Sequence, residues 1–287
     1  MRRLIFSINP GRSGSEYLAR ILGTADGVHA VHEPLPDGAG RFIKLFPARR
    51  LTLLDLLVYP PLYLRKYMKV AAIRRTLRTL PVDGVYAETN HMFIMSFYDV
   101  VMNHFGGVNV VLLRRWLPAA VKSFIELDHF TPQCPFTKYW YASPNARSSA
   151  GLAPAPDRSL DQEERIIGYL IDIEARAQRF IAKYPDTRVV PIRLEELNDL
   201  DRVRALFAAL DVRETPRTRE TVGRVVNAKL GHKQRVARSV TIEYCQERVV
   251  RYLERCAQAG ITLPALPQLE EVPDGRGGRG PSASRQA

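Results

Sequence analysis

The sequence predicts an α/β fold in which a central, mainly parallel sheet is flanked by helices. Two observations lead to this prediction. Continuous apolar runs, which are typical of strands buried on both faces, recur along the chain, as in VNVVLL at 108–113. Segments of helical character separate these runs, and strands that alternate with helices form parallel sheets. With 287 residues and 46% apolar content, the chain is long enough to bury a large core.

The first strand leads into a loop that suits an anion. The apolar residues of 4–8 are followed by the turn N-P-G at 9–11 and then by an amphipathic helix. Such a loop presents backbone N–H groups and the positive end of a helix dipole to a phosphate or sulfate, and Gly14 lets the backbone approach closely. A nucleotide kinase or ATPase is expected to place Lys and then Ser or Thr after this glycine, but the chain has Ser15 and Glu16.

The remaining elements alternate in the same way, and residues 1–272 are expected to form one domain. The chain in order predicts an extended segment at 28–38, a helical insertion at 41–80, a strand at 85–88, a buried helix at 91–105, a strand at 108–113, a helix at 118–127, a long irregular segment at 130–159, a helix at 161–183, a strand at 188–192, and a turn and helix at 194–212. The Gly/Arg/Ser-rich tail at 273–287 is expected to be disordered.

The cysteines and the longest hydrophobic region exclude several classes of protein. Cys134, Cys245 and Cys256 are too few and too unevenly spaced for a disulfide framework or a zinc site. The hydrophobic region at 51–64 contains Asp55 and two prolines and is too short to span a bilayer. We therefore expect a cytoplasmic protein without a transmembrane segment, with interfacial attachment of 51–64 as an open alternative.

The formal net charge of +12 does not identify a partner by itself. Nucleic-acid binding requires clustered basic residues interleaved with aromatic ones, or a known module, and the sequence contains no such module. We therefore expect no nucleic-acid partner, and an arginine-rich, solvated surface accounts for most of the excess charge.

A second anion-binding pattern lies after the strand at 108–113. Arg115 follows the strand, and Ser123 comes eight residues later on the next predicted helix. A guanidinium at a strand end can bind a dianion through two parallel hydrogen bonds, and a hydroxyl adds a neutral donor. Kinases and ATPases more often have an acidic residue here to organise magnesium, whereas this chain has Arg114 and Arg115.

Together, G-R-S-G-S at 11–15 and the Arg115–Ser123 pair resemble the donor site of PAPS-dependent sulfotransferases. PAPS is 3′-phosphoadenosine 5′-phosphosulfate, the sulfate donor. The resemblance covers most of 4–232 and implies a P-loop-type three-layer fold, with transfer of the sulfuryl group to a hydroxyl or amine and no metal.

The resemblance also implies roles for individual residues. The 5′-phosphosulfate is expected to bind to Arg12, Ser13, Gly14 and Ser15, with Arg12 stabilising the leaving group, and the 3′-phosphate to Arg115 and Ser123. VNAKLGHK at 226–233 resembles a late loop that closes over the donor, which implies donor contacts from Asn227, Lys229 and Gly231. One departure is Leu194, because the family often has Tyr near the adenine at this point.

Sulfuryl transfer also requires a base for the acceptor proton. Glu33 lies nineteen residues beyond Gly14, where sulfotransferases that use glutamate have their base, although Glu33 can equally cap a turn before Pro34. His91 is the second candidate, since cytosolic sulfotransferases take a histidine from this region. His32 and Glu88 are further candidates for supporting roles.

The sequence leaves the acceptor and two competing functions open. Aromatic residues in the irregular segment suit either an acceptor site for a glycan or small metabolite or a hydrophobic core; these are Phe130, Phe136, Tyr139, Trp140 and Tyr141. One alternative is a magnesium-dependent P-loop nucleotide or small-molecule kinase with an altered loop. The other is a non-catalytic nucleotide-binding scaffold. The oligomeric state is not predicted.

Overall fold

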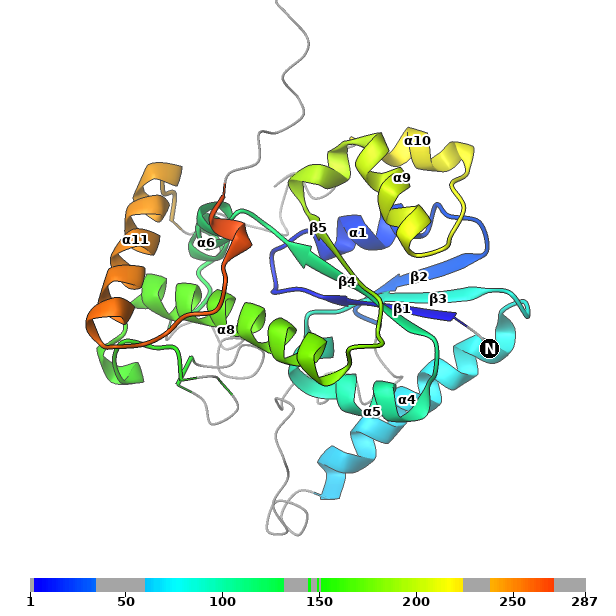
Figure 1. The fold of residues 1–287 in the computed structure, drawn as a ribbon, viewed down its shortest axis with the longest axis horizontal. Coiled ribbons are helices and arrows are strands. Elements are labelled where there is room, and N and C mark those ends of the chain that lie inside the picture. The colour runs from blue at the N-terminus through cyan, green and yellow to red at the C-terminus, as the bar shows by residue number, and fades with distance from the viewer. Residues whose placement is uncertain are drawn as a thin grey trace, which may run out of the picture.

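Five parallel strands form the centre of the molecule, which confirms the predicted α/β class. The computed structural model describes residues 3–34, 60–131, 144, 145, 149, 151–223 and 238–270, with only the backbone described at 60–65. The strands are β1 (Arg3–Ile8), β2 (Val28–His32), β3 (Val85–Thr89), β4 (Val108–Arg114) and β5 (Val189–Arg193), in the spatial order β2-β3-β1-β4-β5. Each pair of neighbours runs parallel (Figure 1).

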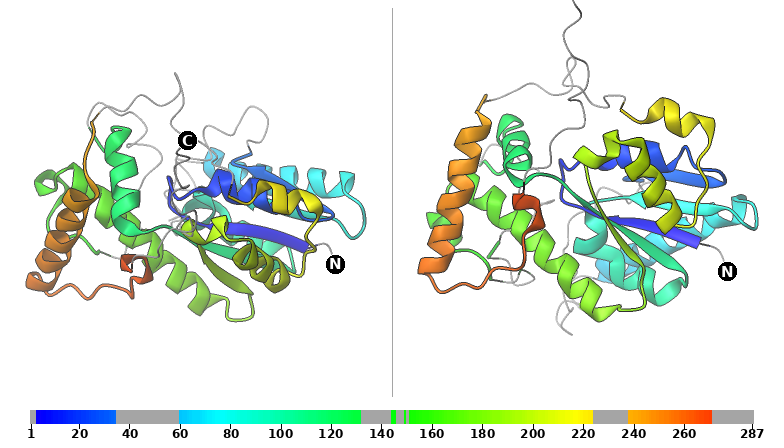
Figure 2. Two further views of the ribbon diagram at one scale, coloured as in Figure 1. Left: turned by 90° about the horizontal axis from the view of Figure 1, so that it is seen from above. Right: turned by 45° about the horizontal axis from the view of Figure 1, so that its top comes forward.

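Helices cover both faces of the sheet, and β1 divides its side chains between the two cores. Ile5 packs into the core beneath α1 (Ser15–Leu22) and α9 (Leu200–Ala209). Phe6 packs into the opposite core. That core is formed with α4 (Pro60–Thr79), the π-helical turn η1 (Phe93–Phe97), α5 (Tyr98–His104) and α8 (Gln162–Lys183). Figure 2 shows helices over both faces of the sheet. Residues 4–8 of β1 are all buried, and they are apolar except for Ser7 rather than alternating with polar residues.

A group of helices extends the molecule beyond the sheet. In this group α6 (Leu117–Glu126) and α11 (Ile242–Gln258) pack with α8 (Figure 1). The inner side of α11 carries Cys245, Val249, Tyr252 and Cys256, all of which are buried. Sequence analysis did not predict α11 or the short helix α10 (Pro216–Thr221).

The predicted elements agree with the structure wherever it describes them, with two refinements. The helix expected at 91–105 begins as η1 and continues as α5, and the described part of the insertion at 41–80 is the helix α4. The rest of that insertion, most of 130–159 and the tail at 273–287 lie outside the described residues. Among the helices that are described, none is both long enough and apolar enough to cross a membrane.

The strand order fixes where a ligand site can form. The chain leaves β1 towards β2 on one side of the sheet, and it leaves β4 towards β5 on the other side. β1 and β4 are neighbours, so the connections that leave their carboxyl ends run in opposite directions. Such a topological switch point is where open α/β sheets bind ligands. The loop after β1 and the segment after β4 therefore meet at this point.

Candidate functional site

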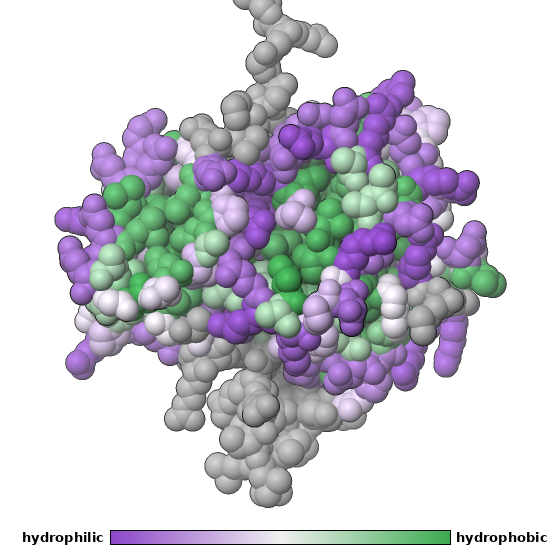
Figure 3. Space-filling model, viewed as in Figure 1, coloured by the Kyte–Doolittle hydropathy of each residue, from purple (hydrophilic) through white to green (hydrophobic). Residues whose placement is uncertain are grey.

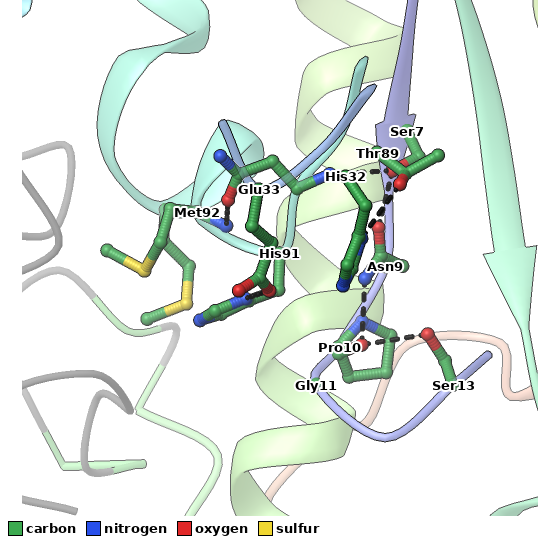
Figure 4. A network of polar contacts seen from close by, with 12 residues as sticks. Ser7, Asn9, Pro10, Gly11, Ser13, His32, Glu33, Thr89, His91 and Met92 are labelled. Carbon is green, nitrogen blue, oxygen red and sulfur yellow. Dashed lines mark hydrogen bonds and ion pairs between the residues drawn. The ribbon is translucent and has the colours of Figure 1, made fainter. Parts of the chain in front are cut away.

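The loop after β1 is held in shape by its own polar side chains (Figure 4). Ser7 Oγ lies 2.5 Å from Asn9 Oδ1, and Asn9 Nδ2 donates to the Pro10 carbonyl at 2.9 Å. The Ser13 hydroxyl donates to the same carbonyl at 2.8 Å, and its side chain is buried. Ser13 thus braces the loop with its hydroxyl, and any contact with an anion would come from its backbone N–H.

Gly14 occupies a position that requires glycine. It caps α1 in the left-handed region, with φ 86°. A Cβ atom at this position would lie 2.3 Å from Cδ1 of Leu194. Leu194, where the resemblance implies a tyrosine, therefore packs directly against the loop after β1.

Three predicted donor-site residues from two strand ends converge at the switch point. Arg115 Nη1 donates to the carbonyl oxygen of Arg12 at 2.8 Å. Arg12 Nε lies 3.4 Å from Ser123 Oγ on α6. Arg12 has a positive φ of 62°, which turns the chain at this point of the loop. The loop after β1 and the start of α6 are thus joined by two arginines and one hydroxyl.

The two consecutive arginines after β4 have different roles. Arg114 binds Glu174 of α8 through two parallel hydrogen bonds of 2.9 and 2.7 Å, so it holds β4 against α8. Arg115 turns towards the loop instead. Burial lowers the pKa of Arg115 from its ordinary value, and the nearby Arg12 acts in the same direction, while Glu195 opposes both. An arginine nevertheless stays charged at neutral pH, so two cations lie close together in a partly buried site.

The two candidate bases form one hydrogen-bonded pair (Figure 4). His91 Nδ1 lies 2.5 Å from Glu33 Oε1; the histidine is buried, and the Glu33 side chain is 25% exposed. A carboxylate can only accept, so Nδ1 carries the proton when Glu33 is ionised. Glu33 follows β2 and His91 follows β3, and the two strands are neighbours with His32 opposite Thr89.

Solved structures similar to this chain are sulfotransferases, whereas no protein-family model and no curated protein matches the sequence. A sulfotransferase domain from the curacin biosynthetic pathway aligns with a TM-score of 0.51 and 12% identity over 92% of this chain and 99% of that chain. The chain has the sulfotransferase fold.

Two further sulfotransferases align with a lower TM-score of 0.48. The enzyme from Alicyclobacillus acidocaldarius is 14% identical over 92% of this chain and 98% of its own. STF1 from Mycobacterium tuberculosis H37Rv is 15% identical over 88% of this chain and 77% of its own. At these identities the similarity concerns the fold, and the chemistry has to be argued from the site.

His129 lies near Arg12 and His91, and the sequence does not predict this proximity. It follows α6 between Asp128 and Phe130, both of which have positive φ. Burial and the charge of Arg12 lower the pKa of His129 to about 4, and His91 contributes in the same direction. The imidazole is therefore neutral at pH 7. No motif marks this residue in the sequence, because its proximity to Arg12 arises from the turn after α6.

Two of the residues singled out in the sequence have local partners. Glu16, which follows the anion loop, pairs with Arg20 one helical turn later, at 3.0 Å. His32 Nδ1 lies 3.0 Å from Thr89 Oγ1, and burial lowers its pKa although Glu33 and Glu16 oppose the shift. The Glu16 carboxylate is thus partly balanced by a cation of its own helix.

The remaining predicted site residues divide into two groups. Phe130 is buried and packs near Phe124 and Tyr169, with ring centroids 5.8 and 5.4 Å apart, so it belongs to the hydrophobic core. The other group lies outside the described residues; it consists of Asn227, Lys229 and Gly231 of the late loop and of Phe136, Tyr139, Trp140 and Tyr141 of the irregular segment.

Proposed function

We propose that this protein transfers the sulfuryl group of PAPS to a hydroxyl or amine of an acceptor, such as a small metabolite or a glycan. One observation carries the proposal. Arg12, Arg115 and Ser123 meet at the switch point of a sulfotransferase fold, where Arg115 contacts the Arg12 carbonyl at 2.8 Å and Arg12 approaches Ser123 at 3.4 Å.

In the proposed donor site, each anionic group of PAPS meets a separate set of donors. The loop at 11–15 and the N-terminus of α1 bind the 5′-phosphosulfate through backbone N–H groups and Arg12. Arg115 and Ser123 bind the 3′-phosphate. The contact between Arg12 and Ser123 means that the two sets adjoin, as they must if one nucleotide bridges them.

In the proposed reaction, the acceptor oxygen or nitrogen attacks sulfur while the bond from sulfur to the 5′-phosphate oxygen breaks. The acceptor proton passes to the Glu33 carboxylate, and the electron pair of the broken bond stays on the leaving phosphate, whose charge Arg12 stabilises. His91 donates from Nδ1 to Glu33 and so orients the carboxylate. Glu33 and His91, which the sequence offers as alternatives, thus act together.

A magnesium-dependent kinase is the main competing function. Its chemistry needs a loop lysine and a hydroxyl or carboxylate for magnesium, whereas this loop continues with Ser15 and Glu16, and the residue after β4 is Arg115. A non-catalytic scaffold would not require a general base, whereas this site contains the hydrogen-bonded candidates Glu33 and His91.

Thermal unfolding with nucleotides tests the proposal against the kinase. Adenosine 3′,5′-bisphosphate, the desulfated donor, is expected to raise the unfolding midpoint in the presence of a chelator. At a ligand concentration 100-fold above Kd, the stabilisation is about 2.7 kcal/mol. Adenosine 5′-monophosphate, which lacks the 3′-phosphate, is the control and is expected to stabilise less. A shift that occurs only with ATP and magnesium would favour the kinase instead.

The assignment of the base has its own test. Glu33→Gln keeps the shape of the side chain but removes its basicity, so turnover is expected to fall by about 100-fold or more. The shift of the unfolding midpoint by adenosine 3′,5′-bisphosphate should persist. A Glu33→Gln variant with unchanged turnover would rule out Glu33 as the base, and loss of turnover in His91→Gln alone would then transfer the role to His91.

A further inference from the structure

A buried ion pair lies next to the segments that carry Glu33 and His91. Lys69 Nζ of α4 is 2.6 Å from Glu88 Oε1 of β3, and the two side chains are 3% and 0% exposed. Lys69 belongs to the helical insertion predicted at 41–80. The structure instead buries this lysine in the core between α4 and the sheet, where its ammonium lies 5.1 Å from the centroid of the Phe97 ring.

The contacts of this pair lead to the neighbours of both proposed catalytic residues. Lys69 Nζ donates to the carbonyl oxygen of Pro34, the residue after Glu33, at 3.3 Å. Glu88 Oε1 accepts from Nδ2 of Asn90, the residue before His91, at 2.9 Å. The pair therefore links the segment after β2 to the segment after β3.

The other oxygen of Glu88 is also satisfied. The Tyr86 hydroxyl donates to Glu88 Oε2 at 2.7 Å, and burial and this carboxylate raise the pKa of the tyrosine. Asn90 in turn uses its Oδ1 to accept from the Met92 N–H at 3.0 Å, which fixes the chain on the far side of His91. Through Asn90, Glu88 is therefore connected to the backbone on both sides of His91.

Glu33 needs such support because of its backbone conformation. Its φ of 44° lies in the left-handed region, which is unfavourable for a residue with a side chain. The Glu33 N–H donates to the Thr89 carbonyl at 3.0 Å, and Lys69 holds the next carbonyl, that of Pro34. These two contacts fix the peptide unit before Glu33 and the peptide unit that follows Pro34.

Stability alone gives little reason for a buried ion pair here. Desolvation of two charges offsets most of their attraction, and apolar replacements of such pairs are often as stable or more stable. A buried pair whose hydrogen bonds reach two functional segments has a further effect, because it orients them.

We propose that Lys69 and Glu88 are positioning residues that set the 2.5 Å contact between Glu33 and His91. The catalytic consequence of this inference rests on the proposed sulfuryl transfer, whereas the geometric claim does not. It also gives a role to α4: the helix supports the edge of the site that receives the acceptor proton.

The principal test is the double variant Lys69→Met/Glu88→Gln. Lys69→Met alone would leave the Glu88 carboxylate buried without its cation and could unfold the protein, but the double change removes both charges. The matched control is Arg176→Met/Asp172→Asn, which removes another buried pair with a 2.7 Å contact, on α8.

The first measurement needs no activity. In protein labelled with ¹⁵N-histidine, the Nδ1 proton of His91, assigned by its loss in His91→Gln, is expected far downfield because it bridges a short contact to a carboxylate. The double variant is expected to weaken this signal or move it upfield, whereas the control keeps it. A double variant that is folded and has the wild-type signal would overturn the inference.

The second measurement is steady-state kinetics. A displaced base is expected to lower kcat by about 10- to 100-fold with little change in the KM for PAPS. Equal kcat in the double variant and the wild type would also contradict the inference. If wild-type protein neither binds adenosine 3′,5′-bisphosphate nor transfers sulfuryl groups, the proposed function fails, and the His91 signal still decides whether Lys69 and Glu88 position the pair.

Discussion

The hydrogen bond between Glu33 and His91 joins two residues that the sequence presents as alternative candidates for the general base. They are separated by 58 positions, and each follows a different strand. Only the pairing of β2 with β3 brings them to 2.5 Å. The residue types could be predicted from the resemblance, but their partnership could not, because it depends on strand order.

Leu194, where the resemblance to sulfotransferases implies a tyrosine, lies against Gly14 in the structure. Its side chain occupies the space that a Cβ atom at Gly14 would enter. The left-handed φ of 86° favours glycine at this position, and a Cβ atom would also force the end of the Leu194 side chain to shift. Both residues could be singled out in the sequence, but their contact could not be predicted from it.

His129 leads to a prediction about stability and pH. Its folded-state pKa is lowered from 6.5 to about 4 by burial and by Arg12, so the unfolded chain takes up this proton at higher pH than the folded one. Above pH 6.5 the imidazole is neutral in both states, and the free energy of unfolding is expected to fall as the pH drops from 6.5 towards 4.

The variant His129→Gln isolates this contribution from that of the other titrating groups. Urea unfolding of the wild type and the variant at about pH 7.5 and about pH 4.5 is expected to show a smaller loss of stability in the variant. Parallel losses in the two proteins would mean that His129 is not the buried neutral imidazole that the structure shows.

At the scale of elements, buried strands were the most predictable feature. β1 and β4 are mainly apolar, with Ser7 and Asn109 as the polar residues inside them, and such runs are typical of strands buried on both faces. The π-helical turn η1 was not predictable, since its residues, all buried and apolar except Ser96, are equally typical of an ordinary helix.

The helix α11 was missed although its sequence carries a signal. Cys245, Val249, Tyr252 and Cys256 recur at spacings of four and three residues, as the buried side of a helix requires. The resemblance to sulfotransferases ends near residue 232, so no motif accompanies this periodicity. In the structure Tyr252 donates to the Leu152 carbonyl at 2.9 Å, so α11 also holds the chain before α8.

At the scale of the whole molecule, the helices beyond the sheet are tied to it by polar contacts. Figure 3 shows two hydrophobic areas on one face, separated by a band of hydrophilic residues. Arg193, at the end of β5, donates to the carbonyls of Pro267 and Glu270 at 2.5 Å. The segment after α11 is thus bound to the edge of the sheet.

The architecture as a whole also explains the position of the proposed donor site. The loop after β1 and the segment after β4 are about a hundred residues apart in the sequence, and the switch point brings Arg12 and Arg115 into contact. Local motifs predicted the two halves of the site, and strand order joins them.

The central claim is that Arg115 binds the 3′-phosphate of the donor. Calorimetric titration of wild-type protein and Arg115→Met with adenosine 3′,5′-bisphosphate and adenosine 5′-monophosphate tests it most directly. Loss of a charge-assisted contact of about 1.5–3 kcal/mol is expected to weaken bisphosphate binding about 10- to 100-fold and leave monophosphate binding little changed. Arg213→Met, which removes an exposed arginine paired with Asp26, is the matched control and should bind both nucleotides as the wild type does. Equal affinity of the wild type for both nucleotides, or unaltered bisphosphate binding by Arg115→Met, would contradict the account.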